Sequence, residues 1–233
     1  MTKHSVAIIT ARGGSKRIPR KNIKDFLGKP IIEYSIKAAL ESGIFDEVMV
    51  STDDEEIAMI AKSAGAKVPF MRSKDAANDF ATTTDVIREV LGQYKDNGQE
   101  FDYACCIYPT APFVTKELLL KAQNLVEKEG ADSCFPIIQF SFPPQRGMII
   151  ESGNAEYKYP EYQFTRSQDL EKMYHDSGQF YYFNVKRFEH TGKMLGDAIK
   201  PIIISEMKAQ DIDNEEDWKI AEMKYRMIYE STD

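Results

Sequence analysis

The sequence predicts an α/β fold in which a mainly parallel sheet lies between two layers of helices. The first observation is that short apolar runs alternate with longer segments whose apolar residues recur at helical spacing. Such alternation is typical of parallel strands joined by helices that cover both faces of the sheet. The second observation is a cationic loop with paired glycines, directly after the first apolar run. Ligands of such folds bind beyond the carboxyl ends of the strands, where this loop would lie.

The first half of the chain contains the clearest alternation. The acids at 53–56 lie where the dipole of a helix beginning there favours negative charge. Gly43 and Gly65 are natural stops for two of the helices. We expect strands at 6–10, 47–51 and 66–70, and helices at 31–42, 53–64 and 83–94.

The second half continues this order and then interrupts it. Strands are expected at 103–108 and 132–138, on either side of a helix at 116–129. The parallel pattern is expected to return with strands at 179–184 and 201–204, and a closing helix at 215–229. A length of 233 residues fits one domain, and no linker divides it, so we predict a single domain over 1–233.

The interruption at about 140–178 is interpreted as an inserted hairpin or arm. It opens with the rigid sequence Phe-Ser-Phe-Pro-Pro. Aromatic side chains without a local core often pack on a partner chain. We therefore predict a homodimer that uses the arm, whose aromatic residues follow no single helical face: Tyr157, Tyr159, Tyr162, Phe164 and Tyr174.

Composition and charge exclude several classes. The formal net charge of −7 argues against general nucleic-acid binding. The apolar runs are too short to span a bilayer, and no secretory signal follows Met1, so we expect a cytoplasmic protein without a membrane partner. Cys105, Cys106 and Cys134 match no zinc spacing; they are interpreted as small core residues, with a reactive thiol as the alternative.

The loop at 11–22 is the strongest chemical signal. Between Arg12 and Lys24 the chain has six cations and no acid. Paired glycines allow backbone N–H groups to approach a phosphate, and an arginine fork can bind two phosphate oxygens. The loop lacks the Gly-Lys-Ser/Thr ending of a Walker loop and the GxGxxG pattern of dinucleotide-binding folds. By chemistry alone it indicates a triphosphate or polyphosphate site, with a solvated surface loop as the alternative.

The exact residue sequence of this loop is more informative than its general chemistry. Ala-Arg-Gly-Gly-Ser-Lys-Arg-Ile-Pro-Arg-Lys-Asn at 11–22 resembles the signature loop of the CMP-sialic acid synthetase family. The segments Phe-Leu-Gly-Lys-Pro-Ile-Ile at 26–32, Val-Ser-Thr-Asp at 50–53 and Tyr-Pro-Thr-Ala-Pro at 108–112 resemble the same family. So do Gly-Gln-Phe-Tyr at 178–181 and Asp-Ile-Asp at 211–213, and together these segments cover residues 6 to about 218 in the family's order.

The resemblance implies a Rossmann-like, three-layer nucleotidyltransferase, glycosyltransferase-A-like in architecture, that uses CTP and Mg²⁺. Arg12, Lys16 and Lys21 would hold the CTP phosphates and, with Asp211, would be the catalytic residues. Asn22 would contact the nucleotide, Thr83 would lie near the cytidine, and Arg72 is a weaker candidate. The full set of nucleotide-binding residues is then Arg12, Gly13, Gly14, Ser15, Lys16, Lys21, Asn22, Arg72 and Thr83.

Asp211 and Asp213 allow two interpretations. In an extended segment both carboxylates point to one side and can face a single cation, while Ile212 enters the core. Such hard oxygen ligands suit Mg²⁺. Alternatively, Asp213 with Glu216 resembles a capping box before the last helix. Spacing alone does not decide, whereas the resemblance favours metal binding; for Asp53 we favour the role of a helix cap.

The segments at 165–170 and 174–181 resemble the pseudaminic acid branch of the family, which implies an acidic nine-carbon sugar as partner of CTP. Arg166 would bind the sugar carboxylate, or form a surface or dimer salt bridge. Tyr108, Gln179 and Tyr181 would line the sugar pocket or be ordinary packing, and His175 is a pocket candidate only. The alternatives are N-acetylneuraminic, legionaminic or 3-deoxy-octulosonic acid as substrate, transfer to a sugar 1-phosphate, or a nucleotide-binding module without catalysis.

Overall fold

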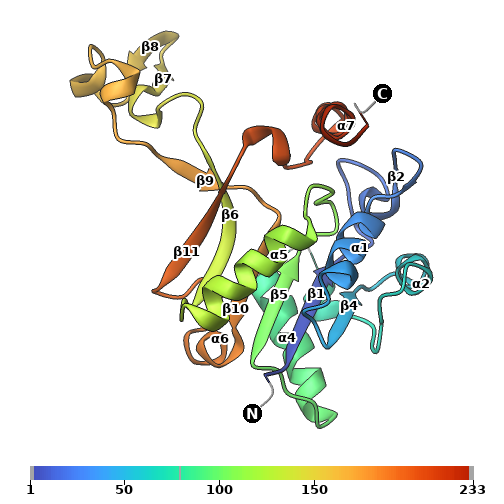
Figure 1. Cartoon of the computed structure of the whole chain (residues 1–233). Coiled ribbons are helices and arrows are strands. Elements are labelled where there is room, and N and C mark those ends of the chain that lie inside the picture. Colours follow the sequence, from blue (N-terminus) through green and yellow to red (C-terminus); the bar gives the residue numbers. More distant parts are fainter. Residues whose placement is uncertain (1–2, 79, 231–233) are drawn as a thin grey trace.

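The protein is built on a seven-stranded mixed sheet, in a computed structural model that describes residues 3–78 and 80–230 (Figure 1). The strand order is β11-β6-β10-β5-β1-β4, and β9 pairs with β6. The bounds are β1 Ser5–Thr10, β4 Glu47–Ser51, β5 Tyr103–Ile107, β6 Ser133–Gln139, β9 Tyr174–Asp176, β10 Phe180–Asn184 and β11 Ile199–Ile204. Parallel pairing of β1 with both β4 and β5, and of β6 with β11, confirms the expected α/β class.

Helices cover both faces of the sheet, which makes three layers. Alternate residues of β1 enter opposite clusters: Ala7 and Ile9 face α1 and α5, whereas Val6 and Ile8 face α4. Figure 1 shows α1 and α5 in front of the sheet and α4 behind it. The helices are α1 Ile32–Ser42, α2 Glu55–Ser63, α3 Lys74–Ala77, α4 Thr83–Asp96, α5 Lys116–Gln123, α6 Val185–Thr191 and α7 Glu215–Tyr229.

Smaller elements complete the described chain. A π-helical segment, Asn124–Lys128, extends α5 and occupies the rest of the helix expected at 116–129. The expectation had not included α3, α6, β9 or the two-stranded sheet of β2 (Asp25–Phe26) and β3 (Lys29–Pro30). Short 3₁₀ turns occur at Lys21–Ile23, Pro144–Arg146, Pro160–Tyr162, Ser167–Asp169 and Glu206–Lys208.

The strand expected at 66–70 is wrong. Lys67 makes one isolated bridge to Met49 beside β4, through the bonds of its own backbone to Val48 and Val50. Pro69 follows two residues later, and a proline has no N–H to donate to a ladder. The segment therefore touches the edge of the sheet and leaves it.

The prediction that the parallel pattern returns after the arm is also wrong for one strand, β10. β10 runs antiparallel to both neighbours, β5 and β6. The physical reason is the arm: β6 leads out to it and β9 leads back, paired antiparallel to β6, so β10 continues in the returning direction. β11 then pairs parallel to β6, as expected.

The arm itself is an inserted hairpin that projects from the sheet (Figure 1). Its strands β7 (Met148–Glu151) and β8 (Asn154–Tyr157) pair antiparallel. Ser152 and Gly153 both have positive φ, 53° and 84°, which is the backbone of a type I′ hairpin turn.

A third apolar cluster holds the two site segments in place. It includes Ile18 of the cationic loop and Ile212 of the Asp-Ile-Asp segment, together with Phe26 and Trp218, whose rings pack edge to face at 5.6 Å. Ile212 is buried, as expected, so its flanking carboxylates are held in position. Among the residues described, no helix is long and apolar enough to cross a membrane.

Candidate active site

A cavity of about 640 Å³ opens beyond the carboxyl ends of β1 and β5, a size typical of small-molecule sites. Thr10 ends β1 and Tyr108 follows β5, and both line it. The cavity brings together ten residues predicted from the sequence: Arg12, Ser15, Lys16, Lys21, Asn22, Arg72, Thr83, Tyr108, Asp211 and Asp213.

The loop side of the cavity is cationic and well anchored. Asn22 is only 6% exposed, and its side-chain amide donates to the carbonyl of Arg12 at 2.8 Å. Asn22 thus shapes the loop as well as lining the cavity. The Lys21 ammonium donates to the carbonyl of Ile212 at 2.6 Å. Burial lowers the pKa of Lys21, while the carboxylates of Asp213 and Asp211 act in the opposite direction.

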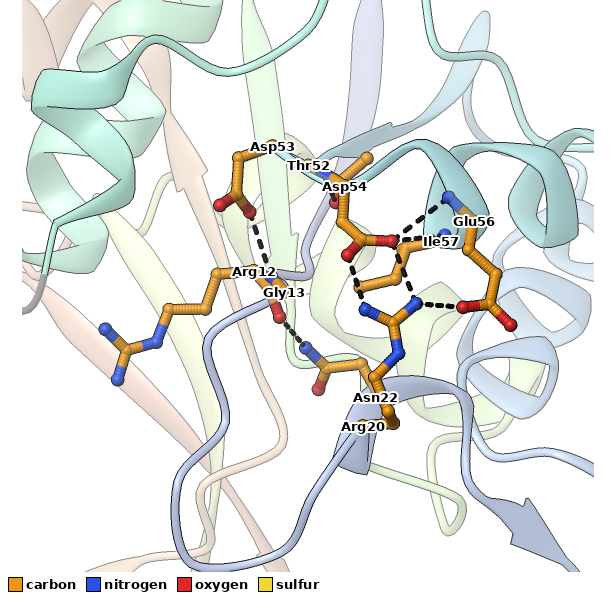
Figure 2. Close-up of polar contacts among 9 residues, drawn as sticks. All are labelled: Arg12, Gly13, Arg20, Asn22, Thr52, Asp53, Asp54, Glu56 and Ile57. Carbon is orange, nitrogen blue, oxygen red and sulfur yellow. Dashed lines mark hydrogen bonds and ion pairs between the residues drawn. The ribbon is translucent and has the colours of Figure 1, made fainter.

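Arg20 belongs to the same loop but does not line the cavity. Its guanidinium forks onto the carboxylate of Asp54 and also contacts Glu56, as Figure 2 shows. Asp54 in turn caps α2 by accepting from the backbone N–H groups of Glu56 and Ile57, each at 3.0 Å. The ion pair therefore ties the cationic loop to the start of α2, and Arg20 keeps a left-handed backbone with φ of 55° there.

Asp53 is not the helix cap that we favoured, because that role belongs to Asp54. The Asp53 carboxylate instead accepts from the backbone N–H of Gly13 at 2.9 Å (Figure 2). Gly13 also packs closely on α2, since a Cβ at this position would lie 2.8 Å from an oxygen of Asp54. Gly13 and Gly14 are in the loop but do not line the cavity. The close packing on Asp54 explains why position 13 has no side chain.

The carboxylates of Asp211 and Asp213 line the cavity next to the cationic loop. The capping alternative for Asp213 is wrong, because Asn214 and Asp217 form the capping box of α7. Asp213 is ion-paired with Arg17 at 2.7 Å. Burial raises the pKa of Asp211, and the charge of Asp213 adds to this, while Lys21 opposes it.

These two carboxylates fit a divalent cation that phosphates help to bind. Both line the cavity beside the cationic loop, and their oxygens are ligands that Mg²⁺ accepts. Within 3–78 and 80–230, no group of three or more His, Cys, Asp or Glu side chains could hold a metal ion.

Arg72 and the start of α4, which were predicted to contact the nucleotide, line another part of the cavity. Arg72 is buried and donates to the hydroxyl and the carbonyl of Ser51 at 3.0 and 2.6 Å. Burial lowers its pKa, and the charge of Asp53 opposes this. Thr83 is the first residue of α4, which Thr82 caps through a capping box with Asp85, and the N-terminal dipole of α4 favours an anion in the cavity.

The predicted sugar residues separate into three groups. Tyr108 lines the cavity, whereas Gln179 and Tyr181 are buried behind its wall. The Gln179 amide donates to the carbonyl of Lys208, and its oxygen is buried without a hydrogen-bond partner among the residues described. Arg166 and His175 are exposed on the arm and do not line the cavity; Arg166 pairs with Asp169 at 2.7 Å.

Sequence reasoning missed several lining residues, most of them small or uncharged, together with Arg17. Gly178 was part of a recognised segment but was not assigned a role, and Asn78 belongs to the turn after α3, which was not expected. The full set missed is Thr10, Arg17, Ala76, Asn78, Ala81, Val86, Pro109, Thr110 and Gly178. Arg17, Pro109, Thr110 and Gly178 lie within recognised segments, so their positions were a usable signal.

Comparison with known proteins agrees with this geometry. Residues 6–215, which include every lining residue of the cavity, match the family model described as cytidylyltransferase. The chain belongs to the cytidylyltransferase family. The family resemblance read from the loop and the Asp-Ile-Asp segment is thereby confirmed.

Relatives of this cytidylyltransferase act on acidic sugars, according to their names. It is 40% identical to the pseudaminic acid cytidylyltransferase of Campylobacter jejuni, over 97% of this chain and 98% of that protein. It is 32% identical to the CMP-N,N'-diacetyllegionaminic acid synthase of Legionella pneumophila, over 93% and 94% of the two chains. The solved structure of CMP:2-keto-3-deoxy-manno-octonic acid synthetase complexed with CTP shares the fold, with a TM-score of 0.68, 18% identity and coverage of 98% and 100%.

Proposed function

We propose that this cytidylyltransferase transfers CMP from CTP to the anomeric hydroxyl of pseudaminic acid and releases pyrophosphate. The observation that carries the proposal is the 40% identity to a pseudaminic acid cytidylyltransferase over nearly the whole of both chains. The cavity supports it, because a cationic loop and a pair of carboxylates face one space large enough for a nucleotide and a sugar.

The reaction asks the protein chiefly to position two anionic substrates and to stabilise phosphoryl charge. The hydroxyl oxygen of the sugar attacks the α-phosphorus, the bond to the β-phosphate oxygen breaks, and the hydroxyl proton is lost to solvent or buffer. Arg12, Lys16 and Lys21 would stabilise the charge on the phosphates. The N-terminus of α4 and Arg72 would hold the nucleoside end.

We propose Mg²⁺ as the cofactor, held by Asp211 and Asp213. Bound there, it would neutralise triphosphate charge and help to orient the reactants. The ion pair of Asp213 with Arg17 supports the proposal, because it shows that this carboxylate is charged and already binds a cation at the cavity.

We also propose a homodimer in the cytoplasm, with the arm at its interface. Three large apolar side chains of the arm are almost fully exposed: Phe142 by 85%, Ile150 by 79% and Phe164 by 89%. Large apolar side chains exposed to this extent are typical of a surface that a partner covers. Arg166 lies on this arm, so a role in binding the sugar carboxylate would require a second copy to bring it to a cavity. The three buried thiols suit a reducing compartment.

The test is product identification. The purified protein is incubated with CTP, Mg²⁺ and pseudaminic acid, and CMP-pseudaminic acid is sought by mass spectrometry, with UTP and ATP as controls. A CMP-sugar formed with CTP alone would support the proposal. Binding of CTP without any product from this sugar or from other acidic nine-carbon sugars would refute it.

A further inference from the structure

The carboxylate of Asp176 joins the arm to the wall of the cavity. Asp176 is the last residue of β9, where the arm returns to the sheet, and its register opposite Ile137 is set by the pairing of β9 with β6. One of its oxygens accepts from the phenol of Tyr181 at 2.5 Å. The other accepts from the backbone N–H of Gly178 at 2.8 Å. The exposed carboxylate of Asp176 thus accepts from Gly178, which lines the cavity, and from Tyr181, which does not.

The bond to Tyr181 leads to a lining residue. Tyr181 is buried on β10, and its ring packs edge to face against Tyr108 with centroids 5.9 Å apart. Phe135 supports the same ring at 5.6 Å. Burial and the hydrogen bond to Asp176 both raise the pKa of Tyr181, so the phenol remains a donor at neutral pH. The ring of Tyr108 is therefore backed by a side chain whose polar end is held by Asp176.

The bond to Gly178 leads to the predicted metal ligand. Gly178 lines the cavity with a positive φ of 65°, and a Cβ there would lie 3.7 Å from the carboxyl carbon of Asp211. Its backbone therefore packs beside that carboxylate. A shift of the Gly178 amide would change the space between Asp211 and the aromatic wall.

We propose that Asp176 is a positioning residue for the acceptor half of the cavity, acting through the Tyr181 phenol on Tyr108 and through the Gly178 amide on the wall beside Asp211. The inference rests on the proposed function, because it assigns this half of the cavity to the acidic sugar. It makes the arm part of the acceptor site through a contact within one chain. Of the residues that would bind CTP, Arg72 makes its hydrogen bonds to Ser51, outside this set of contacts, whereas the charge of Lys21 acts on Asp211.

The test compares four variants in steady-state assays in which CTP and the sugar are varied separately. Asp176→Ala removes both acceptors, Asp176→Asn retains one acceptor oxygen, and Tyr181→Phe removes the phenol donor alone. Glu156→Gln, an exposed carboxylate on β8 of the same arm, is the matched control. We expect Asp176→Ala to raise the KM for the sugar about tenfold, because that factor corresponds to the loss of one or two hydrogen bonds. The KM for CTP should change less than about twofold.

Asp176→Asn and Tyr181→Phe should give intermediate increases, and Glu156→Gln none. A purely structural role would instead raise both KM values together. A second readout is the hydrogen exchange of the Gly178 amide by NMR, which should accelerate in Asp176→Ala and not in Tyr181→Phe.

The outcomes separate the two claims. An active wild type with unchanged sugar kinetics in folded Asp176→Ala would overturn the inference and leave the proposed function intact. A wild type that uses a different acidic nine-carbon sugar would overturn the proposed substrate, and the variants would then be measured with that sugar. A wild type silent with every such sugar would overturn both.

Discussion

At the scale of single residues, the structure separates two kinds of cation within one loop. Arg12, Lys16 and Lys21 line the cavity, as predicted. Arg20 is paired with Asp54 and Glu56, and Lys24 with Glu215. Spacing along the chain could not make this distinction, because the partner carboxylates come from α2 and α7.

The first prediction follows from this division. Arg12→Ala should lower kcat/KM at least about 100-fold, because it removes a fixed donor from the developing phosphoryl charge. Lys24→Ala, two residues after the loop and outside the cavity lining, should stay within about threefold of wild type, because its ion pair with Glu215 lies at the surface and contributes little. Kinetics on variants with native circular dichroism would measure this. Equal losses in both would contradict the division.

At the scale of elements, the fold was predictable where periodicity and caps agree. The strand at 47–51 and the helix at 215–229 have the expected bounds. The strand at 66–70 failed at Pro69, and the direction of β10 depended on the excursion of the arm, which no local pattern encodes. The caps at Asp54 and Asn214 each lie one residue after the predicted position, because several neighbouring polar residues could serve.

The contact between the loop and α2 gives the second prediction. Gly13→Ala should destabilise the protein by about 1–3 kcal/mol, because its new methyl group would collide with Asp54 while Asp54 is held by Arg20 and the helix cap. Gly14→Ala should be much less destabilising, since nothing lies within 4 Å of a Cβ there. Thermal unfolding of both variants measures the difference. A Gly13→Ala variant as stable as Gly14→Ala would show that Asp54 moves aside freely.

At the scale of the whole molecule, segments distant in sequence form one cavity. The loop at 11–22, the start of α4 and the Asp-Ile-Asp segment meet because β1, β5 and the cluster around Ile212 hold them at one edge of the sheet. Apart from Arg17, the lining residues with charged side chains were therefore predictable from their segments. Backbone contributors such as Gly178 and turn residues such as Asn78 were not, because their role depends on which strands are neighbours.

The arm gives the third prediction. If it is the dimer interface, replacing Phe142, Ile150 and Phe164 with serine should convert a dimer into a monomer while the sheet stays folded. Analytical ultracentrifugation at micromolar concentration would measure this, with circular dichroism as the check on folding. A wild-type protein that sediments as a monomer would rule out the arm as a stable interface.

The whole molecule is proposed to activate one acidic sugar, and the most direct measurement is pyrophosphate release from CTP and Mg²⁺ with two sugars in parallel. The account predicts release with pseudaminic acid and little or none with N-acetylneuraminic acid. Efficient release with N-acetylneuraminic acid and none with pseudaminic acid would contradict the proposed substrate while leaving the family intact.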